Sequence, residues 1–430
     1  MACNGVGLLL LSLNLRVACA QYVDPEPLQC LLANRGIAID KCPGLRPVGV
    51  GEILRRIIGK AIMKVTRDDV QRAVGPLQLC AGQPAGVESA IHAMRNFFDD
   101  DDNDGILLID ADNAFNRVNR ATALWNVQFT CPAMKHILIN VYRSATRIFM
   151  KGDKQERFEL LSSEGTTQGC PLAMAMYALA VAPLLKELQP LCKQVWYADD
   201  ATGCDKFRAL RNWFDALLEQ GPKYGYFPKP VKCILITKPE RAEEARLIFR
   251  GSGVEIESEI KDTGIEINSD GTRHLGAAVG TPNFRTLYVK KKISTWIKAV
   301  ENLAVIAATE PHAAFSAFTH CLQSQWTSVS RAMPIISALF EPLEQAIRHR
   351  LLKTLLRRDV NDFERELLSL PARYGGLGVF NPTETSKTAY QNSICVTEPL
   401  VDLILQQARD FEPTEVQITV SDLEAEDVYK

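Results

Sequence analysis

The sequence lacks three features that would assign a function class directly. Its 430 residues carry 49 lysines and arginines against 51 aspartates and glutamates, so the net charge of −2 gives no general attraction to nucleic acid. Its twelve cysteines form no C-x-x-C pair and no zinc-type set with histidine. We therefore expect reduced thiols in an intracellular protein, and a nucleic-acid enzyme would have to concentrate its basic residues locally.

The sequence also lacks an apolar stretch that could cross a membrane. The leader, residues 1–20, contains one apolar run, from Val6 to Leu13, far shorter than the ~20 residues of a membrane helix. The leader ends like a signal-peptide cleavage site, but no lysine or arginine precedes the run, and Asn14 and Arg16 interrupt the apolar region. We expect no membrane partner and a location in the nucleus or cytoplasm.

Basic residues do gather in three parts of the chain. The chain itself is long enough for two or three subdomains. Any single cluster is consistent with a solvated helix face, whereas several together could follow a phosphate backbone. The clusters comprise Lys41, Arg46, Arg55, Arg56, Lys60, Lys64 and Arg67; then Lys290, Lys291, Lys292 and Lys298; then Arg348, Arg350, Lys353, Arg357 and Arg358.

The pattern of apolar residues and turn formers predicts the main elements. The first helix, near 52–66, has a basic face opposite apolar residues at helical spacing, Ile53, Ile57, Ile58 and Ile62. Further on, the pattern indicates a buried strand over 106–110, hairpins over 146–163 and 195–203, helices over 172–188 and 206–220, and a strand over 233–237. Beyond Arg285 it is mostly helical, and no internal repeat is present.

Three carboxylates stand at the ends of apolar strands. A four-residue apolar run ends at Asp110, and Asp112 or Asn113 could cap the helix that follows. A second run leads into Asp199 and Asp200, which we expect at the tip of a hairpin, lifted out of the sheet. Two-metal phosphoryl transfer uses ions about 3.5–4 Å apart, and Mg²⁺ binds carboxylates together with phosphate oxygens and water. Adjacent strands could bring the three carboxylates together for that chemistry.

The order of these blocks resembles a reverse transcriptase of the non-LTR (LINE-like) retrotransposon type. The resemblance covers roughly residues 21–390, and it rests on several blocks in the family's order. The blocks are DKCPGLRPVGVGEILRRIIGKAI (40–62), LLIDADNAFNRVNR (107–120), EGTTQGCPLAMAMYALA (164–180), YADD (197–200), a turn with Lys232, and His274-Leu275-Gly276.

The resemblance implies an α+β palm–fingers–thumb polymerase with an antiparallel palm sheet and a helical thumb. Residues 21–280 would form fingers and palm, with fingers at about 21–100 and 140–167. Residues 281–375 would form the thumb, and 376–430 a C-terminal extension with an acidic tail. The implied partners are an RNA template, a DNA primer and deoxynucleoside triphosphates.

The resemblance also implies a role for each matching residue. Asp110 and Asp199 would bind two Mg²⁺ ions, or Mn²⁺, with Asp200 in the same cluster, and Lys232 would give a proton to the pyrophosphate. The positions expected around the incoming nucleotide are Lys41 and Arg46 over the triphosphate, Phe115 under the sugar, and Gln168 and Gly169 against the base and template. His274 would begin the primer grip.

Several alternatives stay open at this point. Phe115 could be a core residue, Gln168-Gly169 an ordinary turn, and Lys232 a solvated lysine. No endonuclease pattern, zinc knuckle or ribonuclease H-like carboxylate set is present. The chain could therefore be a nucleic-acid-binding descendant without activity. It could also be a DNA-templated polymerase, a terminal transferase, or, on the leader alone, a secreted protein.

Overall fold

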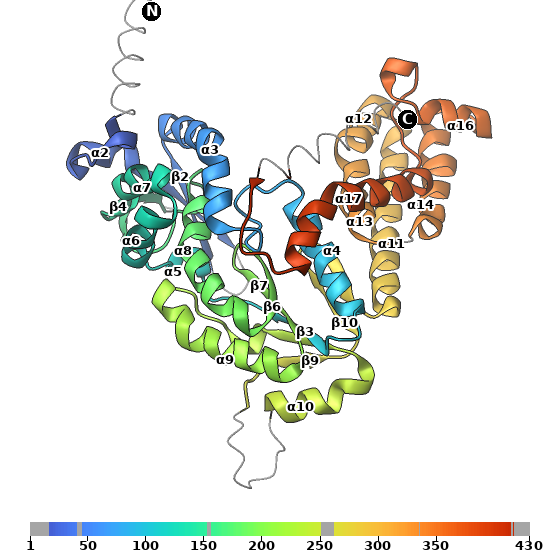
Figure 1. Ribbon diagram of the computed structural model, residues 1–430. Helices are drawn as coiled ribbons and strands as arrows, with labels where there is room; N and C mark the ends of the chain where they lie inside the picture. The colour runs from blue at the N-terminus through green and yellow to red at the C-terminus, as the bar shows by residue number, and fades with distance from the viewer. Residues whose placement is uncertain are drawn as a thin grey trace, which may run out of the picture.

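The computed structural model describes residues 17–40, 45–152, 156–250, 262–334, 336–413 and 416 (Figure 1). Helices and strands are mixed along the chain, which confirms the predicted α+β class. Within these ranges no helix combines the length and the apolar character needed to cross a membrane. All ten cysteines of the described ranges are free thiols, as predicted from their scatter.

The first sheet, here called the palm sheet, has the strand order β6-β7-β3-β8-β9. Its strands are β3 (Gly105–Ile109), β6 (Lys193–Tyr197), β7 (Asp200–Asp205), β8 (Ile234–Thr237) and β9 (Glu266–Asn268). β3 lies in the middle, pairs antiparallel with β7 and β8, and is buried along its whole length. The predicted antiparallel sheet is confirmed, except that β9 runs parallel to β8.

Helices pack against the palm sheet and connect it to the rest of the chain (Figure 1). α4 (Gly86–Asp99) contacts β3, β6 and β7, and α9 (Phe207–Tyr224) contacts β7. α8 (Ala173–Leu188) packs on α9 and is apolar almost all round, because it is buried on nearly every side. α10 (Ala242–Arg250) packs on α9 and β9.

The second sheet, here called the fingers sheet, has the order β2-β1-β4-β5. Its strands are β1 (Asn34–Asp40), β2 (Leu45–Gly51), β4 (Thr146–Lys151) and β5 (Arg157–Ser162). The predicted hairpin over 146–163 is confirmed as the antiparallel pair β4 and β5. The short helices α2 (Pro25–Leu32), α5 (Ala114–Arg117), α6 (Arg120–Thr130) and α7 (Lys135–Tyr142) belong to the same half of the molecule.

α3 (Ile53–Val74) is a helix as predicted, but the predicted apolar side was wrong for two of its four isoleucines, while Ile58 and Ile62 are partly buried. Ile53 and Ile57 are 70% and 60% exposed. Arg55 is buried instead, and its guanidinium donates to the Leu32 carbonyl at 2.8 Å. The helix turns this side inward because Gly59 lets it approach α8, where a Cβ would come within 3.0 Å of Pro171.

The C-terminal third is helical. Its elements are β10 (Gly271–His274), β11 (Ala277–Gly280), α11 (Pro282–Ala307), α12 (Pro311–Ala317), α13 (Thr327–Ala332), α14 (Glu341–Ala346), α15 (Lys353–Leu356), α16 (Asp362–Ser369) and α17 (Pro382–Leu405). α17 packs on α4 and α13, so these helices share a core with the palm sheet. The subdomain boundaries and the thumb role stay predictions.

The basic cluster at 348–358 is largely neutralised by neighbouring carboxylates. Arg348 pairs with Asp362 at 2.7 Å, and Lys353 pairs with Asp359 at 2.8 Å. Arg358 also pairs with a carboxylate, that of α16, at 2.7 Å. These pairs leave less charge for nucleic-acid phosphates than the sequence indicates.

Candidate active site

The two adjacent aspartates lie at a tight turn between β6 and β7. Tyr197 pairs with Asp200, so the turn consists of Ala198 and Asp199 alone. Asp200 is therefore the first residue of β7, and the prediction that both aspartates are lifted out of the sheet was wrong for it. The turn places Ala198 at φ 56°, a left-handed conformation that costs energy for a residue with a Cβ.

Gln78 holds this turn in place. Its Nε2 donates to the Ala198 carbonyl at 3.1 Å, and its Oε1 accepts from the Ala198 amide at 2.9 Å. Its side chain is fully buried, so both backbone groups of the turn are satisfied without water. Tyr226 adds a hydrogen bond from its hydroxyl to the Asp199 carbonyl at 2.9 Å. Sequence reasoning missed Gln78, whose one signal is an amide between the apolar Leu77 and Leu79.

Asp110 reaches the same place from the neighbouring strand. Ile109 at the end of β3 is opposite Ala201 in β7, so the next residue of β3 comes level with the start of β7. The Asp110 carbonyl accepts a hydrogen bond from the Lys229 amide at 2.8 Å, which fixes the backbone as it leaves the sheet. The register of β3 against β7 therefore brings Asp110 and Asp200, which are 90 positions apart in the sequence, into one site.

A cavity of about 560 Å³ opens at this end of the palm sheet. Every described residue that was predicted to bind metal or nucleotide or to transfer a proton contributes to its lining; Lys41 lies outside the described residues. The predicted residues among the lining are Arg46, Asp110, Phe115, Gln168, Gly169, Asp199, Asp200 and Lys232. The lining also includes 111–114, Asn116, Cys170, Ala173 and Met174.

The carboxylates in the cavity repel one another. Burial, then the charges of Asp199 and Asp110, raise the pKa of Asp200 to about 6. The ammonium of Lys232 lies 3.8 Å from Asp110 Oδ1, and both side chains are about half exposed. A hard cation would relieve this repulsion, so the residues present fit Mg²⁺. Within the described ranges no three acidic, histidine or cysteine side chains could hold an ion by themselves, so phosphate oxygens and water would have to complete its shell.

Asp112 faces the cavity but is already paired. Arg117 donates to its Oδ2 at 2.9 Å, and the Lys229 ammonium lies 3.8 Å from its Oδ1. Asn113 occupies the N-cap position of α5, but at φ 47° its side chain makes no capping hydrogen bond. Asn113 is thus the N-cap residue, as one of the two predicted alternatives, but its side chain makes no capping bond. The Asp112 carboxylate forms ion pairs instead.

Phe115 forms part of the cavity wall and packs on the core behind it. Its ring stacks on Tyr177 with the centroids 4.4 Å apart and the planes 22° from parallel. Burial, then the charges of Asp199 and other acidic groups, raise the pKa of Tyr177 well above its usual value. Phe115 is therefore both a core residue and a lining residue, which were alternatives from sequence alone.

Gln168 and Gly169 join this wall to the fingers sheet. The Gly49 amide of β2 donates to the Gln168 carbonyl at 2.8 Å. Gly169 adopts φ 101°, and a Cβ there would come within 2.7 Å of the Gly49 carbonyl oxygen. The close approach that requires glycine is thus to the strand that carries Arg46.

His274 lies outside the cavity lining. It ends β10, and the turn that follows contains Leu275 at φ 47° and Gly276 at φ 87°. Its Nε2 is 3.4 Å from Thr202 Oγ1, and burial lowers the pKa of His274 to about 4. A neutral histidine bound to β7 suits a structural role, and its position at a primer grip stays a prediction.

Comparisons with known proteins identify the family. The family model for the reverse transcriptase (RNA-dependent DNA polymerase) matches residues 39–276. No curated protein matches the sequence.

Solved telomerase structures are similar at low identity. Apo telomerase from Candida tropicalis has a TM-score of 0.49 and 11% identity, with 93% of this chain and 69% of that chain covered. Telomerase from Candida albicans, in complex with a TWJ fragment of telomeric RNA, has a TM-score of 0.43 and 11% identity, with 90% and 68% covered. A C-terminally truncated apo telomerase from C. tropicalis has a TM-score of 0.40 and 11% identity, with 61% and 55% covered. The chain thus spans between about half and two thirds of the length of these structures.

The family match extends over more than half of the chain, and the carboxylates Asp110, Asp199 and Asp200 fall inside it. The chain belongs to the reverse transcriptase (RNA-dependent DNA polymerase) family.

Proposed function

We propose that this chain is an RNA-directed DNA polymerase that adds deoxynucleotides to a primer 3′-hydroxyl. The observation that carries the proposal is that one cavity brings together three carboxylates and two cations. Asp110, Asp199 and Asp200, at the ends of paired strands, line it with Arg46 and Lys232. Opposed charges at the end of a buried sheet are what phosphoryl transfer to a polyphosphate requires. An RNA template, a DNA primer and deoxynucleoside triphosphates are the proposed partners.

Asp110, Asp199 and Asp200 are the proposed ligands for Mg²⁺. Bound there, the ions would lower the pKa of the attacking hydroxyl and hold the leaving oxygen. The protein holds these residues in place, because Asp110 directly follows the buried β3 and Gln78 fixes the turn before Asp200. The backbone that carries the carboxylates is therefore held in place by the protein itself.

The other lining residues have proposed roles toward the nucleotide. Arg46 would bind triphosphate oxygens through two donors. Lys232, 3.8 Å from Asp110 Oδ1, would hold a proton where the pyrophosphate departs. Phe115, held by its stack on Tyr177, would leave no space for a 2′-hydroxyl and so favour deoxynucleotides.

We further propose that the chain derives from a non-LTR retrotransposon. The support is the order of its motif blocks, from the Arg-Pro block at 40–62 to YADD at 197–200. The basic residues of α11 at 290–298 would contact the duplex backbone, so binding should weaken steeply with salt.

Primer extension tests the proposal. The assay uses poly(rA)/oligo(dT), dTTP and Mg²⁺ and compares the unchanged chain with Asp199→Asn, which keeps the size of the side chain and removes its charge. We expect extension by the unchanged chain and none by the variant, with equal thermal stability of the two. A folded chain that binds the duplex and does not extend it would contradict the proposal and favour a binding protein without activity. Extension of single strands, or of DNA templates alone, would assign a different polymerase class.

A further inference from the structure

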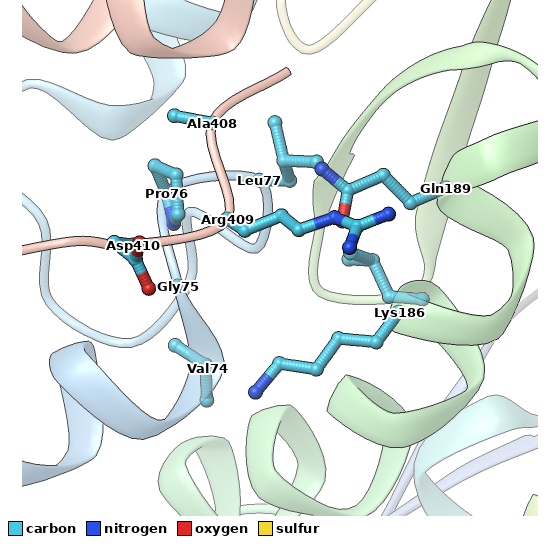
Figure 2. A pocket seen from close by; sticks show the side chains of 10 residues that line it. Val74, Gly75, Pro76, Leu77, Lys186, Gln189, Ala408, Arg409 and Asp410 are labelled. Atoms are coloured by element: carbon cyan, nitrogen blue, oxygen red, sulfur yellow. The ribbon is translucent and has the colours of Figure 1, made fainter.

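The C-terminal strap, residues 406–413, ties the end of the chain to both halves of the molecule. Figure 2 shows 408–410 lying beside 74–77, the segment that ends α3 and follows it. Gln407 pairs with β6: its Nε2 donates to the Gln194 carbonyl and its Oε1 accepts from the Gln194 amide, both at 2.9 Å. The start of the strap is therefore fixed to the outer edge of the palm sheet.

From the palm sheet the strap runs to the exposed side of α3. Two nitrogens of Arg72 donate to the two carboxylate oxygens of Glu412, at 3.0 and 3.1 Å. This bidentate pair has directional geometry as well as charge. The chain beyond Glu412 consequently begins next to the last turn of α3.

The exposed side of α3 is unusually apolar and basic. Val65 is seven residues before Arg72, and therefore two turns away on the same side, and it is 81% exposed. Ile57 continues this side. Lys60 and Lys64 project between these apolar residues, are exposed, and pair with no carboxylate within the described part of the chain. We call this side, residues 53–65, the α3 face.

The sequence that follows the strap is complementary to the α3 face. Residues 417–430 contain four carboxylates against one lysine, and apolar residues alternate with the acids. The acids are Asp422, Glu424, Glu426 and Asp427, and the apolar residues include Ile418, Val420, Leu423 and Val428. Opposite charge and matching apolar content favour contact of this segment with an exposed apolar and basic helix.

The length of the chain allows that contact. Asp422 is ten positions after Glu412, so an extended chain spans up to about 33 Å between them. Lys60 is twelve positions before Arg72, or about 18 Å along the helix axis. We propose that residues 417–430, here called the acidic tail, dock on the α3 face and shield its lysines. The docked tail would compete with nucleic-acid phosphates for these lysines. This competition rests on the proposed function, whereas the docking does not.

The proposed contact between the acidic tail and the α3 face is weak enough to be reversible. Single exposed ion pairs contribute little, but a tether of a few residues raises the effective concentration of the tail to about millimolar. Salt screens exposed pairs, so the tail should detach at high ionic strength. A polyphosphate backbone, with its high charge density, should displace it.

Zero-length carbodiimide cross-linking of the full chain tests the docking directly. The reagent joins a lysine amine to a carboxylate in contact with it, and mass spectrometry of peptides assigns the pair. We expect Lys60 or Lys64 joined to the acidic tail at low salt, with loss of the product at about 1 M salt, where screening is nearly complete. Mixing isotope-labelled and unlabelled chains separates links within one chain from links between chains.

Matched variants make the result decisive. Lys60→Gln with Lys64→Gln should abolish the product, whereas Lys223→Gln, on α9, should not change it, because α9 packs on α8 and β7. Tail links only to other lysines, links only between chains, or no tail links from a folded protein would each overturn the proposal.

Duplex binding tests the competition. With Asp422 and Asp427 changed to Asn and the two tail glutamates to Gln, we expect about three- to tenfold tighter binding of an RNA–DNA duplex at low salt. The gain should vanish in the Lys60→Gln and Lys64→Gln background. An equal gain in both backgrounds would overturn competition at α3. A chain that shows the cross-link and binds no duplex would contradict the proposed function and leave the docking in place.

Discussion

The palm sheet and the fingers sheet differ most in what covers them. β3 in the palm sheet is buried at all five positions, whereas β5 in the fingers sheet is exposed at five of its six. The outer edge of β6 is also covered, by hydrogen bonds between Leu77, Leu79 and Trp196 and by Gln407. The outer edge of β5 carries Phe158 and Leu160, both about half exposed.

The difference indicates a division of labour. A sheet with a buried central strand and a covered edge keeps carboxylates in fixed positions, which phosphoryl transfer requires. An exposed apolar sheet surface is typical of a site that contacts a ligand or partner. The palm sheet should therefore respond to substitution through catalysis and stability, and the fingers sheet through binding.

The largest expected effect is at the carboxylate that ends β3. Asp110→Asn should lower kcat by about 10³-fold or more, because it removes the charge that meets the cation and the developing phosphate charge. Asp112→Asn, two residues on, should cost less than about tenfold, since Arg117 and Lys229 already neutralise that carboxylate. Steady-state primer extension measures both. Equal losses would contradict the assignment of Asp110.

The next largest expected effect is on the free energy of unfolding, which should differ between substitutions in the two sheets. Leu107→Ala in β3 should lower the free energy of unfolding by about 2–5 kcal/mol, because the side chain is fully buried and leaves a cavity. Leu160→Ala in β5 should change it by less than about 0.5 kcal/mol, since the side chain is 51% exposed. Chemical denaturation of the two variants gives the values. A comparable loss in both would show that the fingers sheet is covered in solution.

A third test concerns the cavity wall. Phe115→Ala should reduce the preference for deoxynucleotides over ribonucleotides by about tenfold to a hundredfold, because the space for a 2′-hydroxyl opens. The matched change Phe149→Ala in β4 removes a half-exposed ring of the fingers sheet and should leave the preference unchanged. The ratio of kcat/KM for dTTP and UTP measures the effect. An unchanged ratio in Phe115→Ala would assign that ring to the core alone.

The smallest expected effect is at the support of the turn. Gln78→Leu leaves the Ala198 amide and carbonyl without their partner, which should cost about 1–3 kcal/mol of stability. It should also lower kcat about tenfold, since Asp199 follows directly and loses its fixed position. Gln128→Leu, on α6, is the control and should change neither. A stable Gln78→Leu with full activity would show that Tyr226 alone holds the turn.

Much of the active site followed from local sequence. The apolar run before Asp110 indicated a buried strand, and a carboxylate at its end is costly unless it reaches water or a cation. The hairpin that contains Asp199 and Asp200 was likewise predicted from a short apolar run followed by small turn formers. Strand period and turn chemistry are short-range properties, so a single sequence determined where the carboxylates occur along the chain.

Only the tertiary structure decided how these pieces meet. The register of β3 against β7 brings Asp110 to Asp200, and no local pattern specifies the register between distant strands. The buried side of α3 also depended on a partner, since Gly59 and the buried Arg55 turn inward while Ile57 turns outward. Helix periodicity fixes that a helix forms, but which side is buried depends on the surfaces it packs against, and those surfaces come from residues far away in the chain.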